Sequence, residues 1–144
     1  MRKSWVVVAD SSRARFFIAD KPAGPLNELK DLTYPEARLH EGDLISDNAG
    51  RERNNAHGAH PYSRKDEHKQ EAAIRFANQI CDELEAGRTA GEFDKLYIVA
   101  APSFLGLLRK CRNGALKKTV AAEIDKDLTT LDPKAIRERL PDFL

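Results

Sequence analysis

The sequence predicts an α/β fold in which three helices pack on a mixed five-stranded sheet. Two apolar runs rich in β-branched and aromatic residues follow one another near the N-terminus. A long helical pattern occupies the middle of the chain, and strand-like and helix-like segments alternate after it. The 144 residues are enough for one hydrophobic core, whereas two independent cores would be too small. We therefore expect residues 1–144 to form a single domain.

The N-terminal part of the chain predicts three strands. Trp5–Ala9 and Arg15–Ala19 are apolar runs joined by the polar cluster DSSR, a pattern that is typical of a β-hairpin. Since the first run is apolar at consecutive positions, we expect both of its faces to be covered, as in a central strand. After a turn rich in proline and glycine, residues 26–34 (LNELKDLTY) alternate loosely and predict a third strand.

A long polar segment follows at about residues 36–62. Gly, Asn, His, Asp and Arg dominate it, and it has no apolar period. Loops longer than about 12–15 residues are uncommon in compact domains unless they are functional or disordered. A linker would have to join two domains, but the rest of the chain is needed to complete the first one. We therefore expect a polar loop that projects from the body of the protein.

A long amphipathic helix is predicted after this loop. Ser63 followed by Asp66 is similar to the capping box that begins many helices. Apolar residues then recur at steps of three and four as far as Leu84, which places them on one face of a helix. Gly87 supplies a stop signal. A helix over Arg64–Ala86 would be about 35 Å long, enough to cross a whole sheet.

The C-terminal third predicts two strands and two short helices. Lys95–Ala101 (KLYIVAA) has the composition of a buried strand, and a short helix follows from Pro102 until Asn113 and its neighbouring glycine end it. Val120–Ile124 predicts the last strand. Asp132 before a proline is a good N-cap, so we expect a final helix over Asp132–Arg139.

Four residues that could serve catalysis have simpler structural interpretations. Asp10 ends the first strand, where nuclease-like folds hold a metal. That chemistry needs several converging carboxylates, and the sequence offers no second acid at a strand end. We expect Asp10 to form the turn instead. Ser103 follows a strand, but APSFL lacks the glycines of a nucleophile elbow, so we expect an N-cap. Cys81 and Cys111 fall on apolar helix faces and are expected to fill the core.

Two histidines in the polar segment, His57 and His60, form the pattern HxxH. Zinc requires three or four ligands in tetrahedral geometry, and two histidines in a loop rich in Gly and Asn do not supply them. We therefore expect these side chains to be solvated or to contact a partner, and we expect no metal and no cofactor.

Charge is nearly balanced overall but uneven along the chain. The 24 Lys and Arg residues against 23 Asp and Glu give a net charge of +1, which argues neither for nor against nucleic acid as a partner. Between Phe104 and Lys118 there are basic residues and no acid: Arg109, Lys110, Arg112, Lys117 and Lys118. A second basic group lies in and after the polar segment: Arg51, Arg53, Arg64, Lys65 and Lys69. Such residues can contact phosphates without regard to base sequence.

The cellular setting is expected to be cytoplasmic. The longest apolar run near the N-terminus, Trp5–Ala9, is too short for a membrane span or for the apolar core of a signal peptide. Two cysteines make no dense disulfide framework, which favours a reducing compartment. We therefore expect no membrane insertion, whereas the oligomeric state is left open.

Three stretches resemble a known family: VVVADSSRARFF, YIVAAPSFLGLLRKCRN and AEIDKDLTTL. They are similar to the bacterial proteins required for attachment to host cells, and the resemblance covers nearly the whole chain. It implies a fold like the middle domain of archaeal and eukaryotic peptide-chain release factors and, more loosely, like ribonuclease H. In that release-factor domain a long loop before a long helix carries Gly-Gly-Gln into the peptidyl-transferase centre of the ribosome. The corresponding residues 42–62 contain no Gly-Gly-Gln, and the nearest fragment is HGAH at 57–60.

These observations favour a non-enzymatic binding module for ribosomal or other structured RNA. The residues expected to contact RNA are Arg51, Arg53, His57, His60, Arg64, Lys65, Arg109, Lys110 and Arg112. One alternative is a host-attachment factor that acts through contacts with host or cell-surface proteins. Another is a hydrolase of esters or phosphoesters that uses the histidines of the polar segment.

Overall fold

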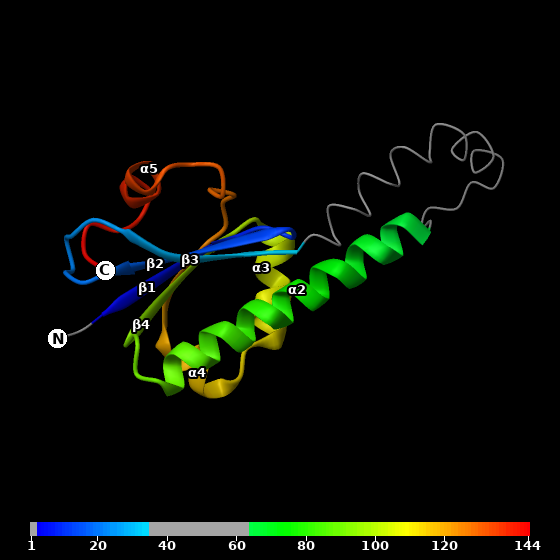
Figure 1. Ribbon diagram of the computed structural model, residues 1–144, viewed down its shortest axis with the longest axis horizontal. Coiled ribbons are helices and arrows are strands. Elements are labelled where there is room, and N and C mark those ends of the chain that lie inside the picture. The colour runs from blue at the N-terminus through cyan, green and yellow to red at the C-terminus, as the bar shows by residue number, and fades with distance from the viewer. Residues whose placement is uncertain (1–2, 35–63) are drawn as a thin grey trace.

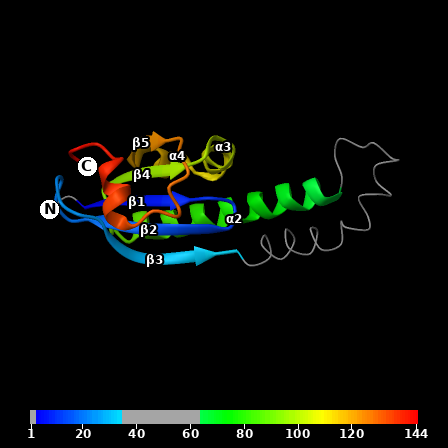
Figure 2. The same cartoon turned by 90° about the horizontal axis from the view of Figure 1, so that it is seen from above.

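The α/β fold predicted from the sequence is confirmed by the computed structural model, which describes residues 3–34 and 64–144 (Figure 1). One five-stranded mixed sheet has the strand order β3-β2-β1-β4-β5, and Figure 2 shows these strands side by side. The described elements are β1 (Ser4–Ala9), β2 (Arg13–Ala19), β3 (Asn27–Thr33), α2 (Arg64–Thr89), β4 (Lys95–Ala100), α3 (Pro102–Cys111), α4 (Gly114–Thr119), β5 (Val120–Ile124) and α5 (Pro133–Glu138).

Strand β1 lies at the centre of the sheet. It pairs antiparallel with β2 and parallel with β4, and all of its residues are buried, as its continuous apolar sequence predicts. Strand β4 pairs parallel with β5 at one edge. At the other edge β3 pairs antiparallel with β2 and is largely exposed. Charged side chains on this exposed edge discourage pairing with another chain.

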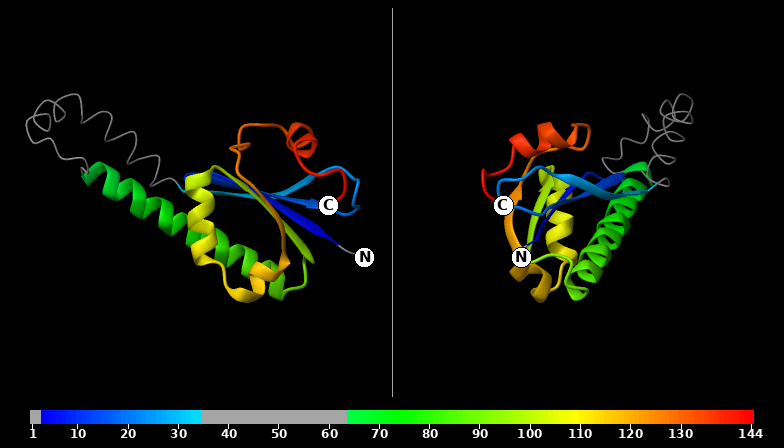
Figure 3. Two further views of the ribbon diagram at one scale, coloured as in Figure 1. Left: turned by 180° about the vertical axis from the view of Figure 1, so that it is seen from behind. Right: turned by 60° about the vertical axis from the view of Figure 1, so that its left-hand side comes forward.

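Helices cover both faces of the sheet (Figure 3). On one face α2, α3 and α4 bury the alternating β1 residues Trp5, Val7 and Ala9. On the other face Val6 and Val8 pack with α5 and the C-terminal residues. The alternation of a strand thus divides the apolar residues of one chain between two packed layers.

The predicted end of the long helix is wrong, because α2 continues through Gly87 to Thr89. A Cβ at Gly87 would lie 2.7 Å from Cη2 of Trp5, so glycine allows the helix to approach the indole ring. Gly91, at φ 72°, follows the helix in the left-handed region. The N–H of Glu92 donates to the carbonyl of Gly87 and the N–H of Gly91 to that of Arg88, which is a Schellman motif.

Four helices, rather than the three predicted, lie in the described residues. The pair Asn113-Gly114 was expected to end a helix, but it also begins α4. Oδ1 of Asn113 accepts a hydrogen bond of 2.7 Å from the N–H of Leu116, which is an N-cap. A helix of this length shows too little apolar periodicity to be recognised in the sequence.

Candidate functional site

The basic surface, defined here as Arg109, Lys110, Arg112, Lys117 and Lys118, is built by α3 and α4. Helix α3 packs through Phe104, Leu105 and Leu108. Because this apolar stripe faces the core, Arg109 and Lys110 point to solvent in the last turn. Cations are favoured there, since the carbonyl end of a helix carries a partial negative charge.

Helix α4 continues the basic surface. Leu116 is its buried anchor, and the exposed Lys117 and Lys118 follow in the last turn. Thr119 donates its hydroxyl hydrogen to the carbonyl of Leu116 at 2.6 Å. Within the described residues, Lys110, Lys117 and Lys118 form no ion pair, so their charges are available to a partner.

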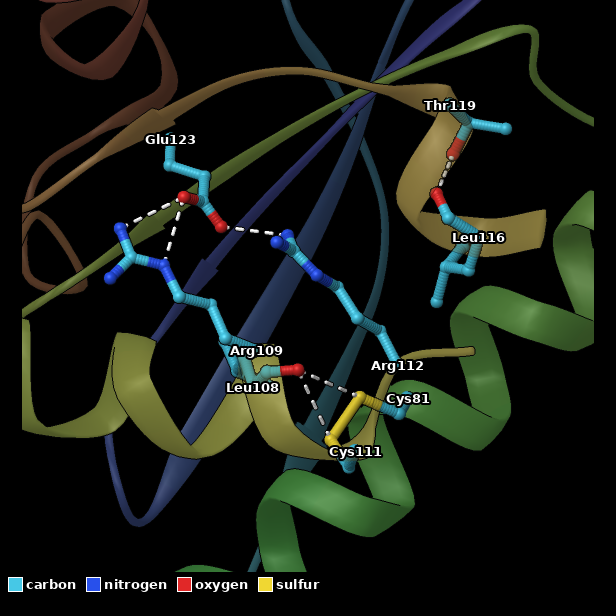
Figure 4. A network of polar contacts seen from close by, with 8 residues as sticks. All are labelled: Cys81, Leu108, Arg109, Cys111, Arg112, Leu116, Thr119 and Glu123. Atoms are coloured by element: carbon cyan, nitrogen blue, oxygen red, sulfur yellow. Dashed lines mark hydrogen bonds and ion pairs between the residues drawn. A yellow bond between two sulfur atoms is a disulfide. The ribbon is translucent and has the colours of Figure 1, made fainter. Parts of the chain in front are cut away.

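Glu123 on β5 joins two cations of this surface (Figure 4). Its Oε1 accepts from Nε of Arg109 at 3.0 Å, and its Oε2 accepts from Nη1 of Arg112 at 2.7 Å. Burial disfavours the charged form of Glu123, but the hydrogen bonds and charges of Arg109 and Arg112 outweigh it, so its pKa is lowered. One carboxylate therefore fixes two guanidinium groups from the end of α3 against the sheet.

The two arginines are not equally available. The side chain of Arg109 is 53% exposed, whereas that of Arg112 is 11% exposed. A guanidinium carries five N–H donors, so Arg109 keeps donors for a further anion after it pairs with Glu123. Arg112, with most of its side chain covered, serves mainly to hold Glu123 in place.

All nine RNA contacts predicted from the sequence stay predictions, and the other six residues lie away from α3 and α4 in the sequence. Arg51, Arg53, His57 and His60 lie outside the described residues. Arg64 and Lys65 begin α2, at the end of the helix that extends past the sheet, whereas α4 packs near its other end (Figure 1). Within the described residues, the structure joins only Arg109 and Arg112 of the predicted set, through Glu123.

The turn-forming role predicted for Asp10 is confirmed. Its Oδ1 accepts from the N–H groups of Ser12 and Arg13, each at 2.8 Å. Its Oδ2 accepts from the hydroxyl of Thr129 at 3.1 Å, and that hydroxyl also lies 2.7 Å from Asp127. That Asp127 shares the Thr129 hydroxyl with Asp10 could not be predicted from the sequence. In the described residues no three His, Cys, Asp or Glu side chains form a group that could hold a metal ion.

The N-cap role predicted for Ser103 is wrong. Ala101 is the N-cap of α3 and makes no side-chain cap, while Pro102 occupies the first turn. Ser103 is exposed one residue further along the helix. A proline at the first helical position needs no cap for its own nitrogen, which makes a serine cap dispensable.

The two cysteines form a disulfide bond rather than filling the core separately. Cys81 on α2 is 6% exposed, in agreement with the prediction, but Cys111 at the end of α3 is only half-buried. Their Cα atoms are 6.2 Å apart, within the usual range for a disulfide. The sequence places each cysteine on an apolar face but does not show that the two faces meet.

A buried arginine on β2 is a further feature that the sequence did not predict. Arg15 donates to both carboxylate oxygens of Glu28 and to the carbonyl of Thr129. Two hydrogen bonds lower the pKa of Glu28 to about 2, and the one from Arg15 has a larger effect than the one with Asp31. The same contact with Glu28 raises the pKa of Asp31. This network joins β2, β3 and the segment after β5, so its role is structural.

Comparison with known proteins supports the fold and the family. Residues 5–140 match the family described as protein required for attachment to host cells. No curated protein matches the sequence. The crystal structure of the archaeal translation termination factor aRF1 is similar, with a TM-score of 0.55 at 11% identity. The match covers 97% of this chain but 35% of that one. An archaeal protein gives a TM-score of 0.47 at 11% identity over 94% of this chain and 35% of its own.

These comparisons confirm the predicted resemblance to host-attachment proteins and to release factors. At such low identity the structural likeness concerns the fold alone. The looser likeness to ribonuclease H stays a prediction. None of the helices within the described ranges has the length and apolar character needed to cross a membrane.

Proposed function

We propose that this chain, which belongs to the family of proteins required for attachment to host cells, is a non-enzymatic binding module that contacts structured RNA through its basic surface. Its effect on attachment is then indirect. The observation that carries the proposal is that α3, its C-cap and α4 carry five cations, of which Arg109 and Arg112 pair with Glu123 while Lys110, Lys117 and Lys118 are exposed.

The arrangement suits the phosphate backbone better than a base. Lys110, Lys117 and Lys118 are exposed point charges, and Arg109 presents a fork of donors held in position by Glu123. The stretch 102–124 contains one aromatic residue, Phe104, which is buried and cannot stack on a base. Phosphate contacts set position and base contacts set sequence preference, so we expect recognition of shape.

The likeness to the archaeal translation termination factor is consistent with this proposal. That protein is described as acting in translation. The likeness concerns the fold, and the proposal that this chain presents cations to ribosomal RNA rests on its own basic surface. The polar segment, with Arg51, Arg53, His57 and His60, is proposed to add further contacts.

The proposal is tested by co-sedimentation of the purified protein with ribosomes over a series of salt concentrations. We compare a variant with Lys110, Lys117 and Lys118 changed to glutamine with a control in which the exposed Lys3, Lys21 and Lys134 are changed instead. The first variant is expected to bind at least tenfold more weakly at low salt. Its affinity should also depend less on salt, so that the magnitude of the slope of log affinity against log salt decreases by about two to three. The control should bind like the unmodified chain.

A variant that is expected to bind RNA more strongly provides a second test. Glu123→Gln removes the only carboxylate that pairs with these cations in the described residues and should strengthen RNA binding at low salt. Absence of salt-sensitive association, or equal losses in both lysine variants, would refute the proposal. Labelling of intact cells that detects the protein at the surface would then favour attachment through protein contacts.

A further inference from the structure

We propose that Cys81 and Cys111 form a reversible thiol–disulfide switch in which the sulfur of Cys111 is the site attacked by a small thiol. The proposal goes beyond RNA binding and does not depend on it. It rests on the placement of the two sulfurs, on the carbonyl groups around them and on a cleft that reaches only one of them.

The disulfide joins two helices that already pack together. Cys81 lies in the second half of α2, and Cys111 is the last residue of α3 (Figure 4). The Cα separation of 6.2 Å lies within the range for a disulfide, so the bond requires no movement of the helices. Packing of Ala77, Ile80 and Leu108 holds the helices in contact whether or not the sulfurs are bonded.

The reduced state is accommodated by the same surroundings. Sγ of Cys111 lies 3.3 Å from the carbonyl oxygen of Ala77, and Sγ of Cys81 lies 3.6 Å from that of Leu108. In the disulfide neither sulfur has a proton to donate. After reduction each thiol has a carbonyl acceptor within reach, so neither thiol is left as an unpaired polar group. The site therefore fits both redox states, which is one requirement for a reversible switch.

Access distinguishes the two sulfurs. Cys81 is buried, whereas Cys111 is half-buried and forms part of the wall of a cleft of about 170 Å³ between α2 and α3. The cleft is also lined by Gln70, Ile74, Asn78, Leu107 and Lys110. A small thiol can enter this space, and Lys110 favours one that carries a negative charge, such as the tripeptide glutathione.

The exchange can be written in two balanced steps. A thiolate attacks Sγ of Cys111, the bond to Sγ of Cys81 breaks, and the released Cys81 thiolate takes a proton from solvent. A second thiolate then attacks the sulfur of the incoming thiol in the mixed disulfide and releases Cys111. Two molecules of the small thiol are oxidised to their disulfide, and both cysteines are reduced. The reverse sequence reforms the bond.

The expected consequence is a change in the stability of the junction between α3 and α4. In the oxidised state the last residue of α3 is bonded to α2. In the reduced state the junction is held by Arg112 pairing with Glu123 and by the Asn113 cap. Local opening should therefore be more frequent after reduction, because a covalent cross-link no longer opposes it.

To test the proposal, the full chain is equilibrated in buffers that differ in the ratio of reduced to oxidised glutathione. Free thiols are then alkylated, and the modified cysteines are located by peptide mass spectrometry. We expect one reversible transition in which both cysteines change together, with the glutathione adduct found on Cys111 at intermediate ratios. Hydrogen exchange of the backbone amides of residues 108–114 should be about tenfold faster in the reduced protein and return on oxidation.

The double variant Cys81→Ser/Cys111→Ser is the control, and its exchange should not respond to glutathione. Cys81→Ser should still form the adduct on Cys111, whereas Cys111→Ser should leave Cys81 unmodified in the folded protein. The proposal would be overturned by equal amounts of glutathione adduct on the two cysteines. It would also be overturned if the cysteines stayed in one redox state in every buffer, or if reduction left the hydrogen exchange of residues 108–114 unchanged. The unmodified chain gives the position of the adduct even if a variant fails to fold.

Discussion

Replacement of Gly87 by alanine offers a sharp test of how α2 packs on the sheet. In an ordinary helix interior Gly→Ala stabilises a protein by about 1 kcal/mol, because the glycine loses more backbone freedom on folding. At Gly87 the added Cβ would lie 2.7 and 2.9 Å from two ring carbons of Trp5 and 3.2 Å from Phe93. Contacts under 3.0 Å with a carbon atom require one of the groups to move.

The ring of Trp5 packs against two aromatic rings on one side and borders a cleft lined by Ile18, Leu29 and Lys30 on another. It is 3% exposed, its centroid lies 4.8 Å from that of Phe93, and its other neighbour Phe16 lies at 6.2 Å. Overpacking of a dense core costs about 1–3 kcal/mol or somewhat more. After the gain in helix propensity is subtracted, we expect Gly87→Ala to destabilise the protein by up to about 2 kcal/mol. For a chain of this size that corresponds to a fall in Tm of up to about 6 °C.

A matched control is provided by Gly106 in α3. A Cβ built there meets no atom within 4 Å, so Gly106→Ala should raise Tm by about 2–3 °C. Thermal unfolding followed by the fluorescence of Trp5, the single tryptophan, measures both variants and reports the ring's surroundings. If Gly87→Ala stabilises the protein as much as Gly106→Ala does, the close approach of α2 to Trp5 is refuted.

Three further predictions concern other parts of the structure. The pKa of Glu28 is lowered to about 2 beside Arg15, whereas a glutamate in the unfolded chain has a pKa of about 4.3. The ionised Glu28 therefore stabilises the fold fully above about pH 4.3, and this stabilisation is lost as the pH falls toward 2. Acid titration of the free energy of unfolding should therefore be flatter for Glu28→Gln, and an unchanged slope would contradict the assignment. Asn113→Ala removes the cap of α4 and should cost about 1 kcal/mol in urea unfolding, with Asn113→Asp close to the unmodified chain. Reduction of the Cys81–Cys111 bond, which spans a sequence separation of 30, should lower the free energy of unfolding by about 3–4 kcal/mol, and the double serine variant should show no further loss on reduction.

Much of the fold could be predicted from the sequence because its signals are local. The apolar run of β1 predicted a central strand, and the stripe of α2 predicted a helix along the sheet. The turn role of Asp10 could be predicted because the backbone N–H groups that donate to its carboxylate belong to residues two and three positions later, Ser12 and Arg13. In the same way the basic composition of residues 109–118 was visible as a charge pattern without any acid.

Contacts between distant residues could not be predicted in this way. The strands, the long helix and the basic segment could be predicted from local patterns, since each depends on neighbours along the chain. The packing of whole elements was needed to show that Glu123 pairs with Arg109 and Arg112 and that Cys81 is bonded to Cys111. The same holds for Gly87, which looks like a stop signal until the ring of Trp5 is placed against it. The physical reason is that periodicity fixes which face of an element is apolar, whereas the packing of whole elements fixes which faces meet.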